Sequence, residues 1–387
     1  LAGCPPDRFG MLVSANCTTE DLYIAQKFTR EVMHSTNIAV PAHALYGNGL
    51  PEVFDILRQS HPLDIINQAS TTLCLGLDVH YAQSVVEVRL HQAKARGARI
   101  ISISPNPQSL NIFVEECLQP IPGKETELIQ RLCDLIGNDP SNTCAAPTQL
   151  RHAADLLREA SSLVILTGPA FLAHPDNHAL LPAVDRLARQ TSARLIALPE
   201  QSNLAGSLLL GVSSPFNPAG QEVDALYLAG EDIPPSLPGR PFLIYQNIYP
   251  PIGALTEEPS GARRADLLLP AAAFTEGGGT LVDYSGCIQA LNPAVQPPGE
   301  ALPTWEILSR IARHLGAPGF DYPTLAALQA EIAAIPAFQP QSRVDSSSAP
   351  QPLPSSRSPY PPSGDHTYLG FPLSRYVAGL RPLHPPG

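Results

Sequence analysis

The sequence predicts an α/β protein built from two doubly wound parallel-sheet domains, followed by a flexible Pro/Ser-rich tail. Short apolar runs alternate with longer segments of helical periodicity, which is the pattern of parallel strands joined by helices. A polar, proline-bearing connection at residues 137–147 interrupts this alternation, and the pattern restarts after it. The 387 residues are sufficient for two domains that each have a core.

The first predicted domain spans residues 1–147. Its first helix, Glu20–Val32, follows an acidic start at Thr18–Asp21 that is suited to capping. Gly97 ends a later helix and separates it from a strand, which indicates a βαβ unit with parallel strands. The other predicted elements are strand Thr72–Gly76, helix Ser84–Arg96, strand Arg99–Ile103 and helix Lys124–Ile136.

The second predicted domain spans residues 148–335. Its elements are helix Gln149–Ala160, strand Leu163–Thr167, helix His178–Gln190, strands Arg194–Leu198, Ala225–Leu228 and Phe242–Tyr245, and helices Pro303–Leu315 and Tyr322–Ile332. Residues 336–387 form the third region. Residues 337–362 are too poor in apolar side chains to form a core, which predicts a flexible linker, and Tyr368–Leu383 is predicted to dock on the body or on a partner.

Composition and charge exclude several classes of function. The 24 basic and 35 acidic residues give a net charge of −11 without a cluster of Lys or Arg, so we expect no nucleic-acid partner. No apolar run approaches the roughly 18 residues of a membrane helix, which predicts a soluble protein without membrane insertion. The chain begins at Leu1, and we expect upstream sequence to be missing.

The cysteines and histidines do not predict a metal site. The seven cysteines contain no CxxC pair, so we expect buried thiols in a reducing compartment and no iron-sulfur or zinc centre within this chain. His174 and His178 are four residues apart, but Pro175 between them argues against a regular helix and a shared ligand face. No HExxH motif and no GxSxG elbow is present.

The stretch Arg263–Gln289 combines an apolar run, a proline, an acidic residue and three glycines. Asp266–Leu269 is predicted to be a short buried strand that Pro270 ends, and Gly277–Gly279 a turn that requires positive φ. This stretch resembles the signature ADxxLPxxxxxExxGTxxNxEGRxQ of the molybdopterin oxidoreductase superfamily. The agreeing residues are Asp266, Pro270, Glu276, Gly279, Thr280, Gly286 and Gln289, whereas Asp283, Ser285 and Cys287 replace Asn, Glu and Arg.

Further stretches carry the same resemblance. Cys17–Tyr23 resembles the family's CTNEENY segment, and Thr36-Asn37 its TNN segment. The family's metal-ligating cysteine or selenocysteine then falls, by counting, on Leu45, and leucine has no donor atom. Gln92–Asn106 is similar to QAKxRGAKIIVxDPR, in which the aspartate and arginine contact the pterin guanine dinucleotide. Ser104 and Asn106 stand there, so a charge-assisted grip is lost.

The resemblance implies two Rossmann-like domains around a vestigial molybdopterin pocket, without a catalytic residue or a metal ligand. Leu228–Asp232 is like the family's GEDP turn and contributes a glycine and a carboxylate to this pocket. The predicted pocket residues are Thr18, Asn37, Ser104, Asn106, Gly230, Glu231, Glu276, Gly279 and Thr280.

Within the superfamily, the closer likeness is to the large iron-sulfur subunit of NADH:quinone oxidoreductase, respiratory complex I. It implies a structural domain of the peripheral arm that binds no cofactor itself, with iron-sulfur clusters in the missing N-terminal part. Its partners would be other peripheral-arm subunits, on the cytoplasmic side of the inner membrane. The alternative is a catalytic subunit such as a formate dehydrogenase alpha subunit, which would bind molybdopterin guanine dinucleotide.

A generic nucleotide-binding module is a third, disfavoured hypothesis, because no GxGxxG motif and no P-loop follows a predicted strand.

Overall fold

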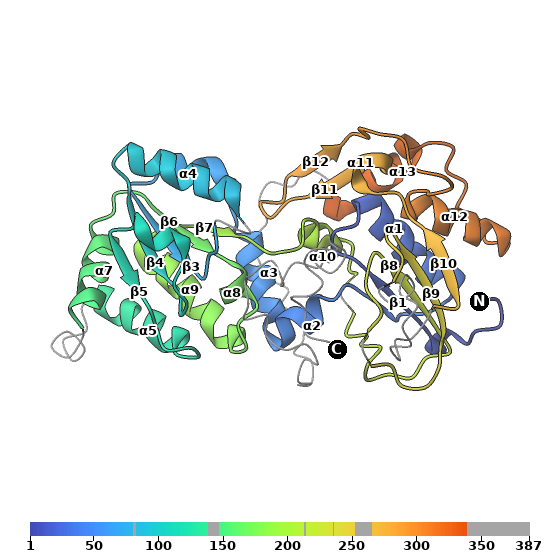
Figure 1. Ribbon diagram of the computed structural model, residues 1–387, viewed down its shortest axis with the longest axis horizontal. Coiled ribbons are helices and arrows are strands. Elements are labelled where there is room, and N and C mark those ends of the chain that lie inside the picture. Colours follow the sequence, from blue (N-terminus) through green and yellow to red (C-terminus); the bar gives the residue numbers. More distant parts are fainter. Residues whose placement is uncertain (80–82, 138–146, 213, 235, 252–264, 339–387) are drawn as a thin grey trace. The chain divides into compact units, whose positions relative to one another are not determined.

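The computed structural model describes residues 1–79, 83–137, 147–212, 214–234, 236–251 and 265–338 (Figure 1). They form two compact units. Among the described residues, unit 1 contains Leu1–Ala44, Gln201–Asp283 and 287–338, and unit 2 contains Leu45–Glu200 with Tyr284–Gly286. Each unit is built on a five-stranded parallel sheet, which confirms the predicted α/β class. The predicted linker and docking tail lie outside the described residues.

The units do not follow the linear division predicted at residue 147. β1 forms hydrogen bonds with β8, a strand more than two hundred residues later in the chain, so unit 1 is assembled from segments on either side of residues 45–200. Unit 2 is therefore an insertion between β2 and β8. A boundary inferred from local composition does not detect pairing between strands that are distant in sequence.

The sheet of unit 1 has the strand order β10-β9-β8-β1-β2 with all neighbours parallel. Its strands are β1 Phe9–Val13, β2 Ile38–Ala39, β8 Ala225–Ala229, β9 Phe242–Asn247 and β10 Leu267–Pro270. A separate antiparallel hairpin pairs β11 (Gly279–Val282) with β12 (Ile288–Leu291). The helices of this unit are α1 Thr19–Lys27, continued by a π-helical turn Phe28–Val32, α10 Leu204–Leu209, α11 Phe274–Gly277, α12 Thr304–His314 and α13 Leu325–Ala333.

Aromatic packing and a buried polar chain join this sheet to its helices. The Phe28 ring, at the end of α1, lies 6.4 Å from Phe9 of β1 and 6.5 Å from Tyr227 of β8. The Tyr227 hydroxyl donates to Gln246 of β9, whose amide donates to the Thr304 hydroxyl of α12 at 2.7 Å. Burying these polar groups is tolerated because each finds a partner.

The burial of β10 differs from the prediction made from the sequence. The sequence predicts that Asp266–Leu269 is a buried strand, but β10 lies at the sheet edge, and Leu267 and Leu268 are 40% and 50% exposed. An apolar run does not distinguish a central strand from an edge strand. Pro270 does end the strand as predicted, and Gly278 and Gly279 have the expected positive φ, whereas Gly277 closes α11 without one.

The sheet of unit 2 has the strand order β5-β4-β3-β6-β7, again all parallel. Its strands are β3 Thr71–Leu75, β4 Arg99–Ile103, β5 Glu116–Leu118, β6 Leu163–Thr167 and β7 Arg194–Ala197. The helices are α2 Ala42–Tyr46, which crosses the unit boundary, α3 Leu50–Arg58, α4 Ser84–Ala95, α5 Glu125–Ile136, α7 Thr148–Arg158, α8 Pro169–Leu172 and α9 Asn177–Thr191. The predicted βαβ unit corresponds to β3-α4-β4.

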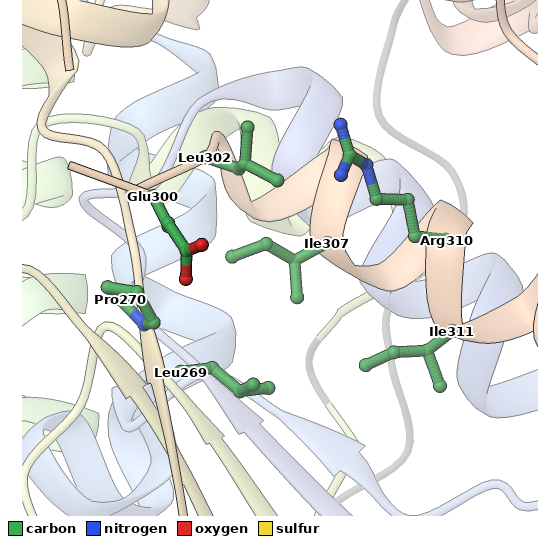
Figure 2. Close-up of a pocket in the computed structure, with 7 residues that line it drawn as sticks. All are labelled: Leu269, Pro270, Glu300, Leu302, Ile307, Arg310 and Ile311. Carbon is green, nitrogen blue, oxygen red and sulfur yellow. The ribbon is translucent and has the colours of Figure 1, made fainter.

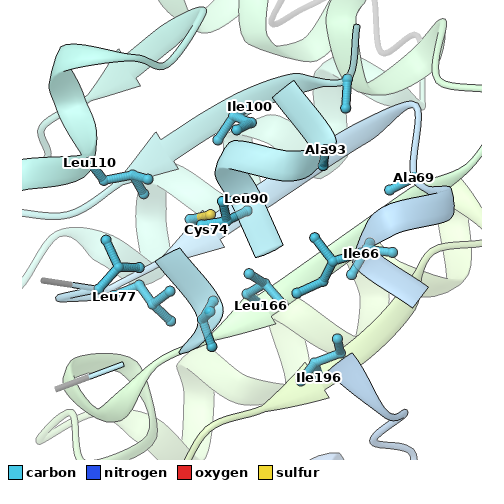
Figure 3. Packing of buried hydrophobic residues seen from close by; sticks show 14 of the residues in the cluster. Ile66, Ala69, Cys74, Leu77, Leu90, Ala93, Ile100, Leu110, Leu166 and Ile196 are labelled. Carbon is cyan, nitrogen blue, oxygen red and sulfur yellow. The ribbon is translucent and has the colours of Figure 1, made fainter. Parts of the chain in front are cut away.

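One face of this sheet packs on α4 and the 3₁₀ segment Leu63–Gln68. Figure 3 shows Ile66, Leu90 and Ala93 against Ile100 and Leu166 of the strands, all fully or almost fully buried. Figure 1 shows α4 on one side of the sheet and α5 on the other, so this unit is covered by helices on both faces. Among the described residues, no helix is long and apolar enough to cross a membrane.

Candidate functional site

In each unit the chain changes direction across the sheet between two adjacent strands, and ligands of open α/β sheets bind beyond the carboxyl ends of such strands. In unit 1 this switch point lies between β1 and β8, because β2 extends the sheet on one side of β1 and β8 and β9 on the other. In unit 2 it lies between β3 and β6. These two edges are the candidate sites.

At the edge of unit 1, the residues after β1 meet those after β8. The backbone N–H of Ser14 donates to the carbonyl of Ala229, and Gly230 follows with φ of 72°. A Cβ at Gly230 would lie 3.1 Å from Cβ of Ser14 and 3.2 Å from Sγ of Cys17, so a glycine suits both the backbone and the space. The predicted residue Gly230 therefore serves to bring the two loops together.

Two acidic groups and a thiol share this edge. Desolvation raises the pKa of the half-buried Glu231 to about 7, although a hydrogen bond with Ser14 opposes the shift. Burial, reinforced by the charges of Asp21 and Glu231, raises the pKa of the Cys17 thiol. Cys17 is therefore a protonated and weakly nucleophilic thiol at neutral pH.

Thr18 begins α1 and forms a capping box with Asp21. The Thr18 hydroxyl accepts from the Asp21 N–H, and the Asp21 carboxylate accepts from the N–H groups of Thr18 at 3.2 Å and Trp305 at 2.8 Å. Desolvation nevertheless raises the pKa of Asp21 to about 6. Because both side chains are bonded to the protein itself, they fix α1 against α12 and offer no free group to a ligand.

The signature residues Gly279 and Thr280 meet Glu20, which is fully buried. The Glu20 carboxylate accepts from the Thr280 N–H at 2.8 Å, from the Thr280 hydroxyl at 3.0 Å and from the Gln329 amide at 2.9 Å. A Cβ at Gly279 would lie 2.8 Å from both this carboxylate and Cγ2 of Thr18. The signature thus ties the hairpin to α1.

Asn203 connects the same hairpin to the loop after β1. This fully buried side chain donates to the Cys17 carbonyl at 2.8 Å and accepts from the Val282 N–H at 2.8 Å. It therefore satisfies two main-chain groups that β11 and the loop cannot pair elsewhere.

The remaining predicted pocket residues of unit 1 have local structural roles. Asn37 donates to the carbonyls of Asp7 at 3.2 Å and Phe9 at 3.1 Å. Glu276 accepts from the Ala273 N–H at 2.8 Å and caps α11. The structure therefore groups Thr18, Gly279 and Thr280 in one network and Gly230 and Glu231 at the neighbouring strand end.

The edge of unit 2 is closely packed, unlike the polar edge of unit 1. Gly76 follows β3 and Gly168 follows β6, and a Cβ at Gly168 would lie 2.4 Å from the Gly76 carbonyl oxygen. The buried Phe171 ring lies where a side chain at Gly76 would point. Main chain and aromatic carbon fill this switch point.

The two predicted residues of unit 2 lie beyond the neighbouring strand, β4. Ser104 is buried and accepts from the Gln108 amide at 3.1 Å, whereas Asn106 is exposed on the turn. Neither supplies the carboxylate or the guanidinium that the family uses against the nucleotide.

The histidine pair does not form a ligand set. His174 Nε2 lies 3.1 Å from the buried Glu125, whereas His178 lies 3.6 Å from Asp176. Across the described part of the chain, no group of three or more His, Cys, Asp or Glu side chains could hold a metal ion.

Sequence reasoning did not identify Ser14, Cys17, Glu20 and Asn203 as site residues. A detectable signal existed, because Phe9–Val13 is an unbroken apolar run followed by small and polar residues, as expected for a central parallel strand that ends at a site. The link between Glu20 and Thr280 joins residues 260 positions apart and has no local signal.

A protein ligand to molybdenum requires a side chain with a donor atom, and the position that the resemblance assigns to this ligand does not provide one. Leu45, at the position that the resemblance assigns to the metal ligand, lies in α2 and carries only carbon atoms in its side chain. The carboxylates Glu20 and Asp21 are already bonded to the protein.

Comparison with known proteins gives one family over most of the chain. A family model described as "Molybdopterin oxidoreductase" matches residues 6–314. The "F420-dependent formate dehydrogenase subunit alpha" of Methanocaldococcus jannaschii is 24% identical over 80% of this chain and 57% of its own length. The "NADH dehydrogenase [ubiquinone] iron-sulfur protein 1, mitochondrial" of Solanum tuberosum is 24% identical over 83% of this chain and 40% of its own length. The chain thus spans about half the length of these relatives.

Among solved structures, a chain of the formyltransferase/hydrolase complex FhcABCD of Methylorubrum extorquens, crystallised with methylofuran, aligns with a TM-score of 0.55. The alignment covers 80% of this chain and 91% of that chain at 18% identity. It supports the fold and, at this identity, nothing finer.

Proposed function

Because the chain belongs to the molybdopterin oxidoreductase family, we propose that it is a structural part of a multi-subunit oxidoreductase, in which the family's fold is retained and the protein provides no ligand to a metal. Redox centres would then lie in other domains or subunits, and this chain would position them. The relatives with this fold include a formate dehydrogenase alpha subunit and an iron-sulfur subunit of NADH dehydrogenase.

One observation carries the proposal: the polar groups around the expected pocket are bonded to one another. Glu20 accepts from Thr280 and Gln329, and the Asp21 carboxylate accepts from the N–H groups of Thr18 and Trp305. Asn203 accepts from the Val282 N–H of the hairpin. A cofactor pocket keeps donors and acceptors directed at its ligand. Here such groups stabilise the contacts between loops and helices, which is the property expected of a scaffold.

The identity of the assembly is less specific than the sequence suggested. The sequence predicts membership of complex I, but the comparisons support the formate dehydrogenase alternative better, because three formate dehydrogenase alpha chains match this chain over at least 80% of its length. Our proposal therefore covers both kinds of assembly. Association with the cytoplasmic side of the inner membrane, through such a complex, belongs to the complex I form of it.

A catalytic formate dehydrogenase subunit is the second candidate. It is supported by similarity to three F420-dependent formate dehydrogenase alpha chains, each 23–25% identical over at least 80% of this chain. This candidate requires bound molybdopterin guanine dinucleotide and a metal that is held without a ligand from Leu45. It makes the opposite prediction for cofactor content.

A single purification distinguishes the two candidate functions. The full-length protein is isolated with its partners from the native organism through a chromosomal tag, and pterin is measured by its fluorescence after oxidative release. The scaffold proposal predicts redox subunits in the complex, no pterin dinucleotide in stoichiometric amount and no dye reduction with formate. Stoichiometric pterin together with formate-dependent dye reduction would establish the catalytic candidate instead. Purification without any redox subunit and without pterin would reject both.

A further inference from the structure

An apolar groove opens between the edge strand β10 and helix α12 of unit 1 (Figure 2). Its cavity volume is about 180 Å³, comparable with the size of one large apolar side chain. The apolar lining consists of Leu269, Pro270, Leu302, Ile307 and Ile311. Next to it, Leu267 and Leu268 are 40% and 50% exposed, so β10 presents apolar surface beyond the groove itself.

The charge of the groove is negative. Arg310 and Glu300 are its two charged lining residues among those described, and Arg310 is paired with Glu306 at 2.6 Å. The exposed carboxylate of Glu300 therefore determines the sign. Residues 265–302, which contribute Leu269, Pro270, Glu300 and Leu302 to the lining, form one acidic wall of the groove. This stretch also contains Asp266, Glu276 and Asp283, and it contains no Lys or Arg. A ligand for this groove should combine apolar side chains with positive charge.

The chain itself contains a segment with this chemistry. After Asp365 the sequence has no acidic residue, whereas Arg375 and Arg381 supply positive charge. Apolar side chains flank both arginines, namely Tyr368, Leu369, Phe371, Leu373, Tyr376, Val377, Leu380 and Leu383. The segment is therefore apolar like the groove and opposite to it in charge.

The connection to this segment is long enough. The described chain ends at Phe338, which belongs to the same unit as the groove. A flexible chain of about 30 residues, the length of the segment between Phe338 and Tyr368, would have a root-mean-square reach of about 30 Å. A unit of this size is about 40 Å across, so a groove on any of its faces is within reach. Tethering also gives the segment a local concentration of about 1 mM.

We propose that Tyr368–Leu383 binds the groove between β10 and α12 of its own chain, with apolar side chains in the cavity and arginine beside Glu300. A second copy of the protein is a poorer occupant, because it would place one acidic wall against another. The bound segment covers the exposed leucines of an edge strand, which removes a surface prone to association.

Hydrogen–deuterium exchange on the full-length protein tests the proposal. At an affinity of about 100 µM, a local concentration of about 1 mM gives about tenfold protection. We expect this slowing in peptides from 368–383 and in those covering 300–311, relative to the double variant Arg375→Glu/Arg381→Glu. The variant Arg343→Glu/Arg357→Glu, with the same charge change in the linker, is the matched control and should exchange like wild type.

Reversing the charges of the groove and of the segment tests their interaction most directly. Glu300→Arg alone should release the segment, and Glu300→Arg combined with Arg375→Glu/Arg381→Glu should restore protection. Equal exchange of 368–383 and the linker in wild type would overturn the proposal, as would equal effects of the two double variants. Protection of 300–311 that rises with protein concentration would assign the groove to a second copy and also reject it.

Discussion

The two switch points of this protein have the same topology and opposite content. In unit 1, β1 and β8 end among ionisable groups, including Cys17, Asp21 and Glu231. In unit 2, β3 and β6 end at Gly76 and Gly168, and the Phe171 ring occupies the space between the loops. Topology marks where a ligand could bind, and the side chains decide whether that space remains available.

The difference also shows how each edge is stabilised. Unit 1 relies on hydrogen bonds from buried polar side chains to loops that would otherwise leave main-chain groups unpaired. Unit 2 relies on close packing of main chain, which only glycine permits at Gly168. Substitutions at the two edges should therefore destabilise the protein for different physical reasons.

The largest effect is expected at the packed edge. In Gly168→Ala, the new Cβ would lie 2.4 Å from the Gly76 carbonyl oxygen, and the backbone must move. We expect a loss of at least about 3 kcal/mol in the free energy of unfolding, measured by urea denaturation. Gly220→Ala is the control, because its Cβ meets nothing closer than 3.9 Å. Equal stability of the two variants would show that the edge of unit 2 is not tightly packed.

The polar edge should respond to loss of Asn203. Asn203→Ala removes the amide that serves the Cys17 carbonyl and the Val282 N–H, and leaves both buried. We expect a loss of about 2–3 kcal/mol in the same denaturation measurement. Asn16→Ala, at an exposed asparagine whose carbonyl accepts from the Ser202 N–H, should cost less than about 1 kcal/mol. If Asn203→Ala were as mild as Asn16→Ala, the polar network would not stabilise unit 1.

Protonation of Glu231 should produce a smaller, pH-dependent effect. Its pKa of about 7 lies above the value of 4.5 for the unfolded chain, so between these pH values the folded state retains a proton that the unfolded state has released. Stability therefore falls as pH rises through this window. After allowance for partial exposure, wild type should lose about 1–2 kcal/mol more than Glu231→Gln between pH 5 and 8.

Thermal or urea denaturation at several pH values measures this difference. Asp21, with a pKa of about 6, titrates in the same direction in both proteins and cancels in the comparison. Parallel stability curves for wild type and Glu231→Gln would contradict the assignment to this edge of a carboxyl group with a raised pKa.

The smallest effect is expected at Ser104. Its hydroxyl accepts from the Gln108 amide, and Ser104→Ala removes only that interaction. We expect a loss of about 1 kcal/mol or less. A loss as large as that of Asn203→Ala would show that unit 2 also has a polar edge, and the contrast between the two units would disappear.

Much of the fold is predictable because its signals are local. Strand Arg99–Ile103 and helix Ser84–Arg96 are placed within one residue, since apolar periodicity and the Gly97 stop define them. The set of segments that forms unit 1 is not predictable from local signals, because β1 pairs with β8, a strand more than two hundred residues later in the chain. The exposure of β10 also depends on its place in the sheet.

The candidate site is predictable in part. Family motifs single out Thr18, Gly230 and Thr280, which lie in unit 1, but they do not show that Glu20 binds Thr280. A motif records which residues recur, whereas the partner of a buried carboxylate depends on tertiary structure. The loss of a donor at Leu45, by contrast, is visible in the sequence itself.

Metal analysis of the full-length protein, purified with its partners from the native organism, tests the absence of a metal ligand most directly. We predict no molybdenum or tungsten above the background of an unrelated control protein, because the family's ligand position carries a leucine. One molybdenum or tungsten ion per chain, retained through gel filtration, would contradict this prediction and identify the protein as a working catalyst.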